Sequence, residues 1–313
     1  MKIGIIGSGG VGGFFGAKLA KSGQDVTFIQ RGPHLEAMQR KGLKIESELG
    51  DIDLPTVRAT DDPAKVGLVD VVLVTVKSGQ TDEAVELTKP MMGKNTAVIT
   101  LQNGVENENR LVAELGEGHV LGGVAYIVSL VKAPGLIKQT GSMCRLEFGE
   151  LDGARSRRAL EFLAACENAS IPAILSENIQ GNIWKKFVVI SPFNGMTSLT
   201  RSSIGSIRED QDCRSLLEAS VKEVLLLAEA KGIPVDFNGS REVMKFFDSM
   251  PHAMTSSMHY DVVNGKPLEV DWLNGAVVRL GKEVGVATPV NGFIYAALKL
   301  LKDGAQNVAQ FNS

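Results

Sequence analysis

The sequence is poor in cysteine and in aromatic residues. Its 313 residues include three cysteines, Cys144, Cys166 and Cys213, and no two of them have the spacing of a metal or redox pair. An odd number without such spacing argues against a disulfide framework and predicts reduced thiols in a cytoplasmic protein. Aromatic residues make up only 5% of the chain, which disfavours a β sandwich built on aromatic cross-strand pairs.

An excess of basic charge and long apolar runs are also missing. There are 33 Lys and Arg against 36 Asp and Glu, a net charge of −3, so we expect neither a nucleic-acid nor a membrane-surface partner. The apolar run at residues 3–6 is too short for a signal peptide, and the longest one, at 71–76, has the length of a strand. The four histidines lack zinc spacing, so no metal is predicted.

Apolar residues and glycines, by contrast, are plentiful, at 44% and 34 residues. In the first half, short β-branched runs alternate with helical patterns, which predicts a doubly wound, parallel α/β sheet. The expected strands are 2–6, 25–30, 69–76, 96–101 and 120–129, and the expected helices are 11–21, 34–41, 81–89 and 106–114. Gly23, Gly42 and Gly116 follow three of these helices, where a positive φ is needed. Runs at 135–139, 145–149 and 171–175 are expected to add strands to the same sheet.

Beyond about residue 178 the pattern becomes purely helical. Helices are expected at 179–190, 213–231, 242–249, 269–283 and 290–301, punctuated by Pro192, Pro234, Pro251, Pro267 and Pro289. We therefore predict an α/β domain over residues 1–177 and an all-helical domain over 178–313.

A dinucleotide-binding motif follows the first expected strand: Gly7-Ser8-Gly9-Gly10-Val11-Gly12. In the G-x-G-x-x-G pattern the first glycine permits a tight turn, the second admits the pyrophosphate, and the third lets helix and strand pack closely. The helix N-terminus then presents N–H groups to the phosphates. The motif makes the first domain Rossmann-type.

The end of the second strand indicates which dinucleotide binds. NAD sites carry a carboxylate there for the ribose 2′-OH, but this strand ends Gln30-Arg31, and Asp25 lies at its beginning. A guanidinium suits a 2′-phosphate, so Arg31 predicts NADP(H). The ends of two further strands carry Lys77 and Asn103, which are candidates for contacts with cofactor or substrate.

Taken together, these motifs resemble the ketopantoate reductase (2-dehydropantoate 2-reductase) family across the whole chain. The resemblance is carried by the glycine motif with Arg31, TVKS at 75–78, LQNG at 101–104, WKKF at 184–187, and SSM at 256–258 followed by LEVDWLNG at 268–275. It implies NADPH-dependent reduction of 2-dehydropantoate to (R)-pantoate, on the route to pantothenate and coenzyme A. It also implies an active site in a cleft between the two domains, and a homodimer.

The resemblance assigns roles to individual residues. Lys186 matches the catalytic acid, and Asn103 matches a residue that contacts both cofactor and substrate. Lys77, Ser129 and Glu269 match cofactor contacts. The substrate pocket matches Asn194, Met254, Thr255, Ser256 and Ser257, with Ser257 as the candidate for the carboxylate.

Elementary chemistry supports the role given to Lys186. Hydride addition to a ketone leaves negative charge on oxygen, which a positioned ammonium can stabilise and protonate. Lys185 and Lys186 point about 100° apart on a helix, so only one of them can face the cleft.

Two departures from the family pattern leave the substrate open. Ile190 and Ile204 stand where the family has asparagine, and an apolar side chain cannot hydrogen-bond a substrate hydroxyl. A different branched 2-oxo acid is therefore one alternative. A β-hydroxyacid or opine-type dehydrogenase and a non-catalytic NADP(H) sensor are two others. The apolar segments 224–227 and 294–301 are candidates for a dimer interface, but core packing is the favoured reading, since helical spacing does not distinguish the two.

Overall fold

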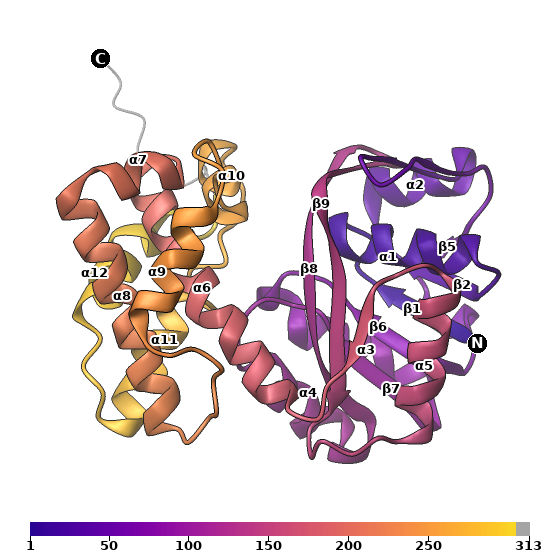
Figure 1. The fold of residues 1–313 in the computed structure, drawn as a ribbon. Helices are drawn as coiled ribbons and strands as arrows, with labels where there is room; N and C mark the ends of the chain where they lie inside the picture. Colours follow the sequence, from indigo (N-terminus) through magenta and orange to yellow (C-terminus); the bar gives the residue numbers. More distant parts are fainter. Residues whose placement is uncertain (305–313) are drawn as a thin grey trace. The chain divides into compact units, whose positions relative to one another are not determined.

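The computed structural model describes residues 1–304 and divides the chain into two compact units (Figure 1). The first comprises Met1–Gln102 and Asn107–Gln180. The second comprises Asn103–Glu106 and the chain from Gly181 onward. The last nine residues of the predicted second domain, 305–313, lie outside the described residues.

Within residues 1–304, ten strands form one sheet, whose main path runs β4-β3-β9-β8-β7-β6-β1-β2-β5, with β10 paired to β9. The strands are β1 Lys2–Ile6, β2 Asp25–Ile29, β3 Leu43–Ser47, β4 Ile52–Leu54, β5 Arg58–Thr60, β6 Val69–Val74, β7 Met92–Thr100, β8 Val120–Ala133, β9 Leu136–Glu150 and β10 Ala173–Leu175. Most pairs are parallel, but β8–β9 and β3–β4 are antiparallel. The predicted α/β fold class is confirmed, as a mixed and mainly parallel sheet.

Helices cover both faces of this sheet. They are α1 Gly10–Lys21, α2 Gly32–Lys41, α3 Thr81–Thr88, α4 Asn107–Leu115 and α5 Arg157–Asn168. In β6 the side chains alternate: Val71 and Leu73 join the core under α1 and α5, while Val72 and Val74 join the core under α3 and α4. Because both faces are buried, the strands read as continuous apolar runs.

The second unit consists of helices: α6 Ile179–Thr200, α7 Ile204–Glu209, α8 Gln211–Ala230, α9 Ser240–Ser249, α10 Ser257–Val263, α11 Asn274–Val284 and α12 Pro289–Leu298. Its core is separate from those of the sheet. The Glu223 carboxylate of α8 accepts the backbone N–H groups of Val290 (2.7 Å) and Asn291 (2.9 Å), so it caps α12 from the neighbouring helix. In the part of the chain that is described, no helix has the length and apolarity needed to cross a membrane.

Several predicted elements were wrong in extent. The helix expected to end at residue 190 continues through Pro192 to Thr200. A proline inside a helix costs about 3 kcal/mol, but Phe187, Phe193 and Met196 are buried in the helical core, and this packing outweighs the lost hydrogen bond.

The ends of other helices and strands also differ from the prediction. Residues 136–139 and 145–149 belong to one long strand, β9, because both stretches pair with β8 in a hairpin, while Gly135 lies in the turn before it. The helix expected from residue 269 begins only at Asn274, because Glu269 lies in a preceding turn whose carbonyl accepts the N–H groups of Trp272 and Leu273. Helices α5, α7 and α10 and strands β3, β4 and β5 were not predicted.

Candidate functional site

The glycine turn joins β1 to α1 as the motif requires. Gly7 has φ +90°, and a Cβ on it would lie 2.6 Å from the Val76 side chain. A Cβ on Gly12 would lie 2.2 Å from Thr75 Oγ1. A Cβ on Gly9 would meet nothing within 4 Å. Gly7 and Gly12 are therefore required by packing within the protein, whereas Gly9 leaves open space above the turn.

Side chains from other elements hold this turn in place. Thr75, after β6, donates from Oγ1 to the carbonyl of Gly7 at 2.5 Å. Gln30, after β2, accepts the backbone N–H of Ser8 at 3.2 Å. This role was not predicted for either residue, because their partners lie 68 and 22 residues away in the sequence.

A buried histidine also braces the turn. His34 Nε2 lies 3.0 Å from the carbonyl oxygen of Ser8, and His34 Nδ1 lies 3.0 Å from the backbone N–H of Gly135, in the β8–β9 turn. A backbone N–H must donate, so Nδ1 accepts and Nε2 carries the proton in a neutral ring. Burial lowers the pKa of His34, and the contact with Ser8 offsets this only in part. This role of His34 was not predicted, because no sequence motif surrounds the residue.

The geometry at the turn fits the phosphates of a dinucleotide. Gly9 at the N-cap of α1 offers no side-chain cap, and the first turn of the helix holds no acidic residue. The N-terminal N–H groups and the positive end of the helix dipole are thus left for an anion. The hydroxyls of Ser8 and Ser129 are buried and have no hydrogen-bond partner among residues 1–304. A Cβ on Gly10 would lie 2.4 Å from the carbonyl oxygen of Ser129, so β8 closely borders the turn.

The two predicted cations of the first unit follow strand ends. Arg31 is the N-cap residue of α2 and pairs with Glu83 of α3, with Nη2 donating to Oε2 at 2.9 Å. Lys77 lies just after β6 and precedes a short 3₁₀ turn, Ser78–Gln80. Glu83 as the partner of Arg31 was not predicted.

In the second unit the two lysines of α6 have different surroundings. Lys185 donates to Asp236 Oδ2 at 2.7 Å, and its ammonium lies 5.2 Å from the ring centroid of Phe237. Lys186 is half-buried. Desolvation lowers the pKa of Lys186 to about 8, although the negative charge of Glu269 raises it. About nine-tenths of such a group is protonated at pH 7, and its proton is far more acidic than that of an ordinary lysine.

The predicted substrate residues of α6 and α10 are linked by hydrogen bonds. Asn194 Oδ1 accepts the backbone N–H of Met258 at 3.0 Å and the Ser257 hydroxyl at 3.3 Å. Thr197 Oγ1 lies 2.7 Å from Ser256 Oγ, and Ser256 also caps α10. Asn194 and Ser256 are buried, whereas Ser257 is exposed.

The remaining predicted residues are distributed as follows. Thr255 is exposed, and the Met254 carbonyl accepts the N–H of Ile204 at 2.9 Å. Ile204 is fully buried in the helical core, while Ile190 is half-buried one turn after Lys186. Asn103 belongs to the second unit, with Lys186, Asn194 and Glu269, whereas the glycine turn, Arg31, Lys77 and Ser129 belong to the first.

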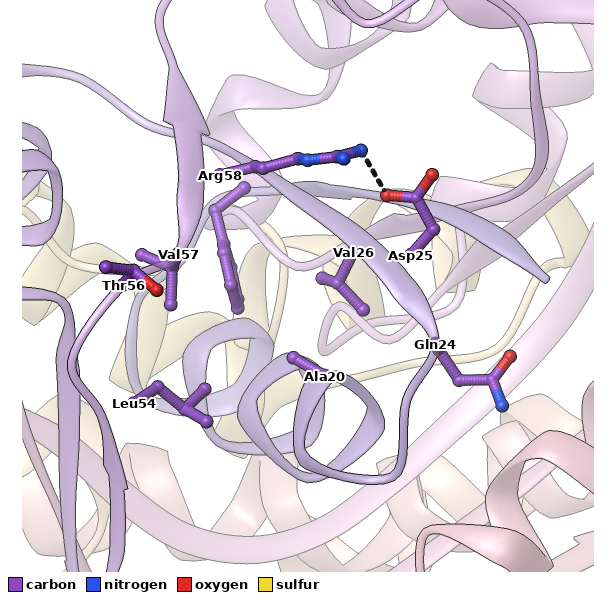
Figure 2. A pocket seen from close by; sticks show the side chains of 9 residues that line it. Ala20, Gln24, Asp25, Val26, Leu54, Thr56, Val57 and Arg58 are labelled. Atoms are coloured by element: carbon purple, nitrogen blue, oxygen red, sulfur yellow. Dashed lines mark hydrogen bonds and ion pairs between the residues drawn. The ribbon is translucent and has the colours of Figure 1, made fainter.

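A hollow of about 360 Å³ in the first unit lies away from the glycine turn. Figure 2 shows the Asp25–Arg58 ion pair, with the apolar side chains of Ala20, Val26 and Leu54 below it in this view. Asp25 begins β2, at the opposite end from Ile29 and Arg31. This hollow is therefore no part of the dinucleotide site.

A mainly parallel sheet covered on both faces, with an uncapped glycine turn after β1, defines a dinucleotide-binding protein of the α/β class. A family model described as ketopantoate reductase PanE/ApbA matches residues 3–153, and the C-terminal model of that family matches residues 178–302. The chain belongs to the ketopantoate reductase family, a family of nicotinamide-dependent reductases.

Individual relatives agree with this family. An uncharacterized oxidoreductase of Bacillus subtilis, YkpB, is 31% identical, covering 96% of this chain and 98% of the relative. The 2-dehydropantoate 2-reductase of Pyrococcus horikoshii is also 31% identical, covering 96% and 97%. A crystal structure of 2-dehydropantoate 2-reductase from Geobacter metallireducens superposes with a TM-score of 0.89 at 30% identity, covering 96% of this chain and 99% of that one.

Proposed function

We propose that this protein is an NADPH-dependent reductase of a 2-oxo acid, with 2-dehydropantoate as substrate and (R)-pantoate as product. The observation that carries the proposal is Lys186, a half-buried ammonium group beside the negative charge of Glu269, with a pKa of about 8. Relatives named 2-dehydropantoate 2-reductase at 30–32% identity support the choice of substrate. That similarity also supports the reaction and a role for it in pantothenate synthesis in the cytoplasm.

The first unit supplies most of the cofactor contacts in this proposal. The N–H groups at the start of α1 bind the pyrophosphate above Gly9, and the hydroxyls of Ser8 and Ser129 are donors for its oxygens. Arg31 binds the 2′-phosphate and Lys77 adds a further contact, while Asn103 and Glu269, which belong to the second unit, are assigned to the cofactor by the family resemblance. A bound reduced nicotinamide supplies the hydride.

The second unit supplies the proton and the substrate contacts. Lys186 Nζ stabilises the negative charge that develops on the ketone oxygen and donates its proton to that oxygen. Ser257 binds the carboxylate. Asn194 holds the α10 N-terminus through the backbone of Met258, so it positions Ser257, flanked by Met254, Thr255 and Ser256.

The side chain of Ile190 favours a second candidate, the reduction of a branched 2-oxo acid without a hydroxyl group. Ile190 is half-buried in the turn that follows Lys186, where an isoleucine offers apolar contact and no hydrogen bond. A site that lacks a polar partner discriminates only weakly between a hydroxylated substrate and its apolar analogue.

A substrate panel tests both candidates. Reduction of 2-dehydropantoate and of branched 2-oxo acids is followed by the loss of absorbance of NADPH or NADH. The proposal expects the highest kcat/KM with NADPH and 2-dehydropantoate. A preference for a branched acid without a hydroxyl would select the second candidate, and no turnover of any 2-oxo acid would contradict both.

Sedimentation of the same protein tests the homodimer that the family resemblance implies.

A further inference from the structure

The guanidinium that follows β2 is already bound within the protein. Arg31 Nη2 donates to Glu83 Oε2 at 2.9 Å, and Arg31 Nη1 pairs with Glu83 Oε1. Two parallel contacts of this kind make a bidentate ion pair. The pair uses both terminal nitrogens, which are the groups that a 2′-phosphate would need.

The pair is specific to one acid of α3. Asp82, the preceding residue, pairs with Arg110 Nη2 at 2.6 Å. Glu86, one turn further on, pairs with Lys89 at 2.5 Å. Among these three acids, Glu83 alone holds Arg31. Glu83 is separated from Arg31 by 52 residues, so the pair depends on the packed fold and not on local sequence.

The ion pair is accessible to a ligand. The side chains of Arg31 and Glu83 are 60% and 41% exposed. Exposed pairs are weak because water and salt screen them, so a phosphate can displace the carboxylate. The carboxylate nevertheless stays nearby and repels a phosphate that carries nearly two negative charges. At about 5 Å and with the dielectric constant of bulk water, which suits two exposed and solvated charges, this repulsion lowers affinity on the order of tenfold.

We propose that Glu83 sets the cofactor preference of this enzyme by competing with the 2′-phosphate for Arg31. The inference rests on the proposed dinucleotide binding. Glu83 lowers the affinity for NADPH and leaves that for NADH unchanged, because NADH has no group that needs Arg31. Glu83 is thus a specificity-determining residue that acts through Arg31, and it reduces the advantage of the phosphorylated cofactor.

The test compares dissociation constants for NADPH and NADH, measured by nucleotide fluorescence on the full chain without substrate. Glu83→Gln keeps the size of the side chain and removes its charge. We expect NADPH to bind about tenfold more tightly to this variant, with the constant for NADH changing less than twofold. Glu86→Gln is the matched control, with the same substitution on the same helix, and it should leave the ratio of the two constants within twofold.

A second background shows whether the effect passes through Arg31. In Arg31→Gln, NADPH should lose its advantage, and adding Glu83→Gln should change the ratio far less than it does in the wild type. If Glu83→Gln changes the ratio of the two dissociation constants equally in both backgrounds, the proposal is overturned. It is also overturned if the ratio changes because NADH binds more weakly.

The two proposals fail in different ways. If the wild type binds a dinucleotide but Glu83→Gln leaves the ratio unchanged, the role of Glu83 is refuted and the cofactor site stands. If the wild type binds neither nucleotide, both proposals fall.

Discussion

The Asn194 side chain of α6 accepts the backbone N–H of Met258, at the start of α10, over 3.0 Å. This bond joins two residues that are 64 positions apart in sequence, and the same oxygen lies 3.3 Å from the Ser257 hydroxyl. The geometry makes Asn194 a positioning residue for the segment that carries Ser257.

Replacing Asn194 by alanine should lower the free energy of unfolding by about 1–3 kcal/mol, because a buried N–H loses its acceptor. It should also raise KM for the 2-oxo acid more than it lowers kcat. Urea unfolding and steady-state kinetics measure the two effects. Asn264→Ala, which removes an exposed amide at the other end of α10, is the control and should change neither. Unaltered KM in the Asn194 variant would separate α10 from substrate binding.

Lys186→Met should reduce kcat by about 10²–10⁴-fold, the range typical of a lost general acid, while the dissociation constant for NADPH stays within about threefold. Lys185→Met removes the neighbouring ammonium, which pairs with Asp236, and should retain most of the activity. A non-catalytic sensor would bind NADPH equally well in all forms and turn over in none of them.

The pKa of Lys186 also predicts a pH profile. Because desolvation lowers this pKa to about 8, the proton needed for reduction is present below pH 8 and is lost above it. The reduction rate should therefore fall about tenfold per pH unit above roughly pH 8. Rates recorded from pH 6 to 10 with saturating nucleotide test this, and a rate independent of pH up to 10 would exclude Lys186 as the proton donor.

His34→Leu should destabilise the first unit, since an apolar side chain can neither donate to the Ser8 carbonyl nor accept the backbone N–H of Gly135. The effect should depend on pH with a defined sign. Burial lowers the folded-state pKa of His34 below its usual 6.5, so below pH 6.5 the unfolded chain binds a proton that the folded chain excludes. The contribution of His34 is complete above pH 6.5 and declines as the pH falls below it. Unfolding free energies at pH 7.5 and 5.5 should show a smaller difference between wild type and variant at the lower pH.

Two adjacent glycines should respond differently to alanine. In Gly10→Ala the new Cβ would lie 2.4 Å from a backbone oxygen of β8, so the protein should lose about 1–3 kcal/mol of stability. In Gly9→Ala the Cβ enters open space, so stability should hold while NADPH affinity falls at least tenfold. Thermal melts and nucleotide titration distinguish the two. Equal affinities for wild type and Gly9→Ala would move the pyrophosphate away from this turn.

Much of the fold was predictable from local sequence patterns. The glycine turn and the buried strands β1, β2 and β6 were predictable because their signals lie within a few consecutive residues. The positive φ expected at Gly23, Gly42 and Gly116 is confirmed. Helix α5 was missed, although Ser156 caps its first turn and Phe162 and Cys166 form one apolar face.

Contacts between residues far apart in the sequence could not be predicted from local patterns. The path of α6 through Pro192 depends on its burial among other helices. The partners Arg31–Glu83 and His34–Gly135 lie 52 and 101 residues apart, and no periodicity specifies which side chains meet at such separations. Motifs could therefore mark the glycine turn, but they could not identify the side chains that brace it.

The assignment of Asn103–Glu106 to the second unit has a practical consequence for dissecting the protein. Arg279 of α11 donates to Glu106 Oε2 at 2.6 Å. A recombinant fragment starting at Gly181 would lack this carboxylate and Asn103. It would therefore contain the helices of the second unit without Asn103–Glu106, which belong to that unit but precede the rest of it in the sequence by more than seventy residues.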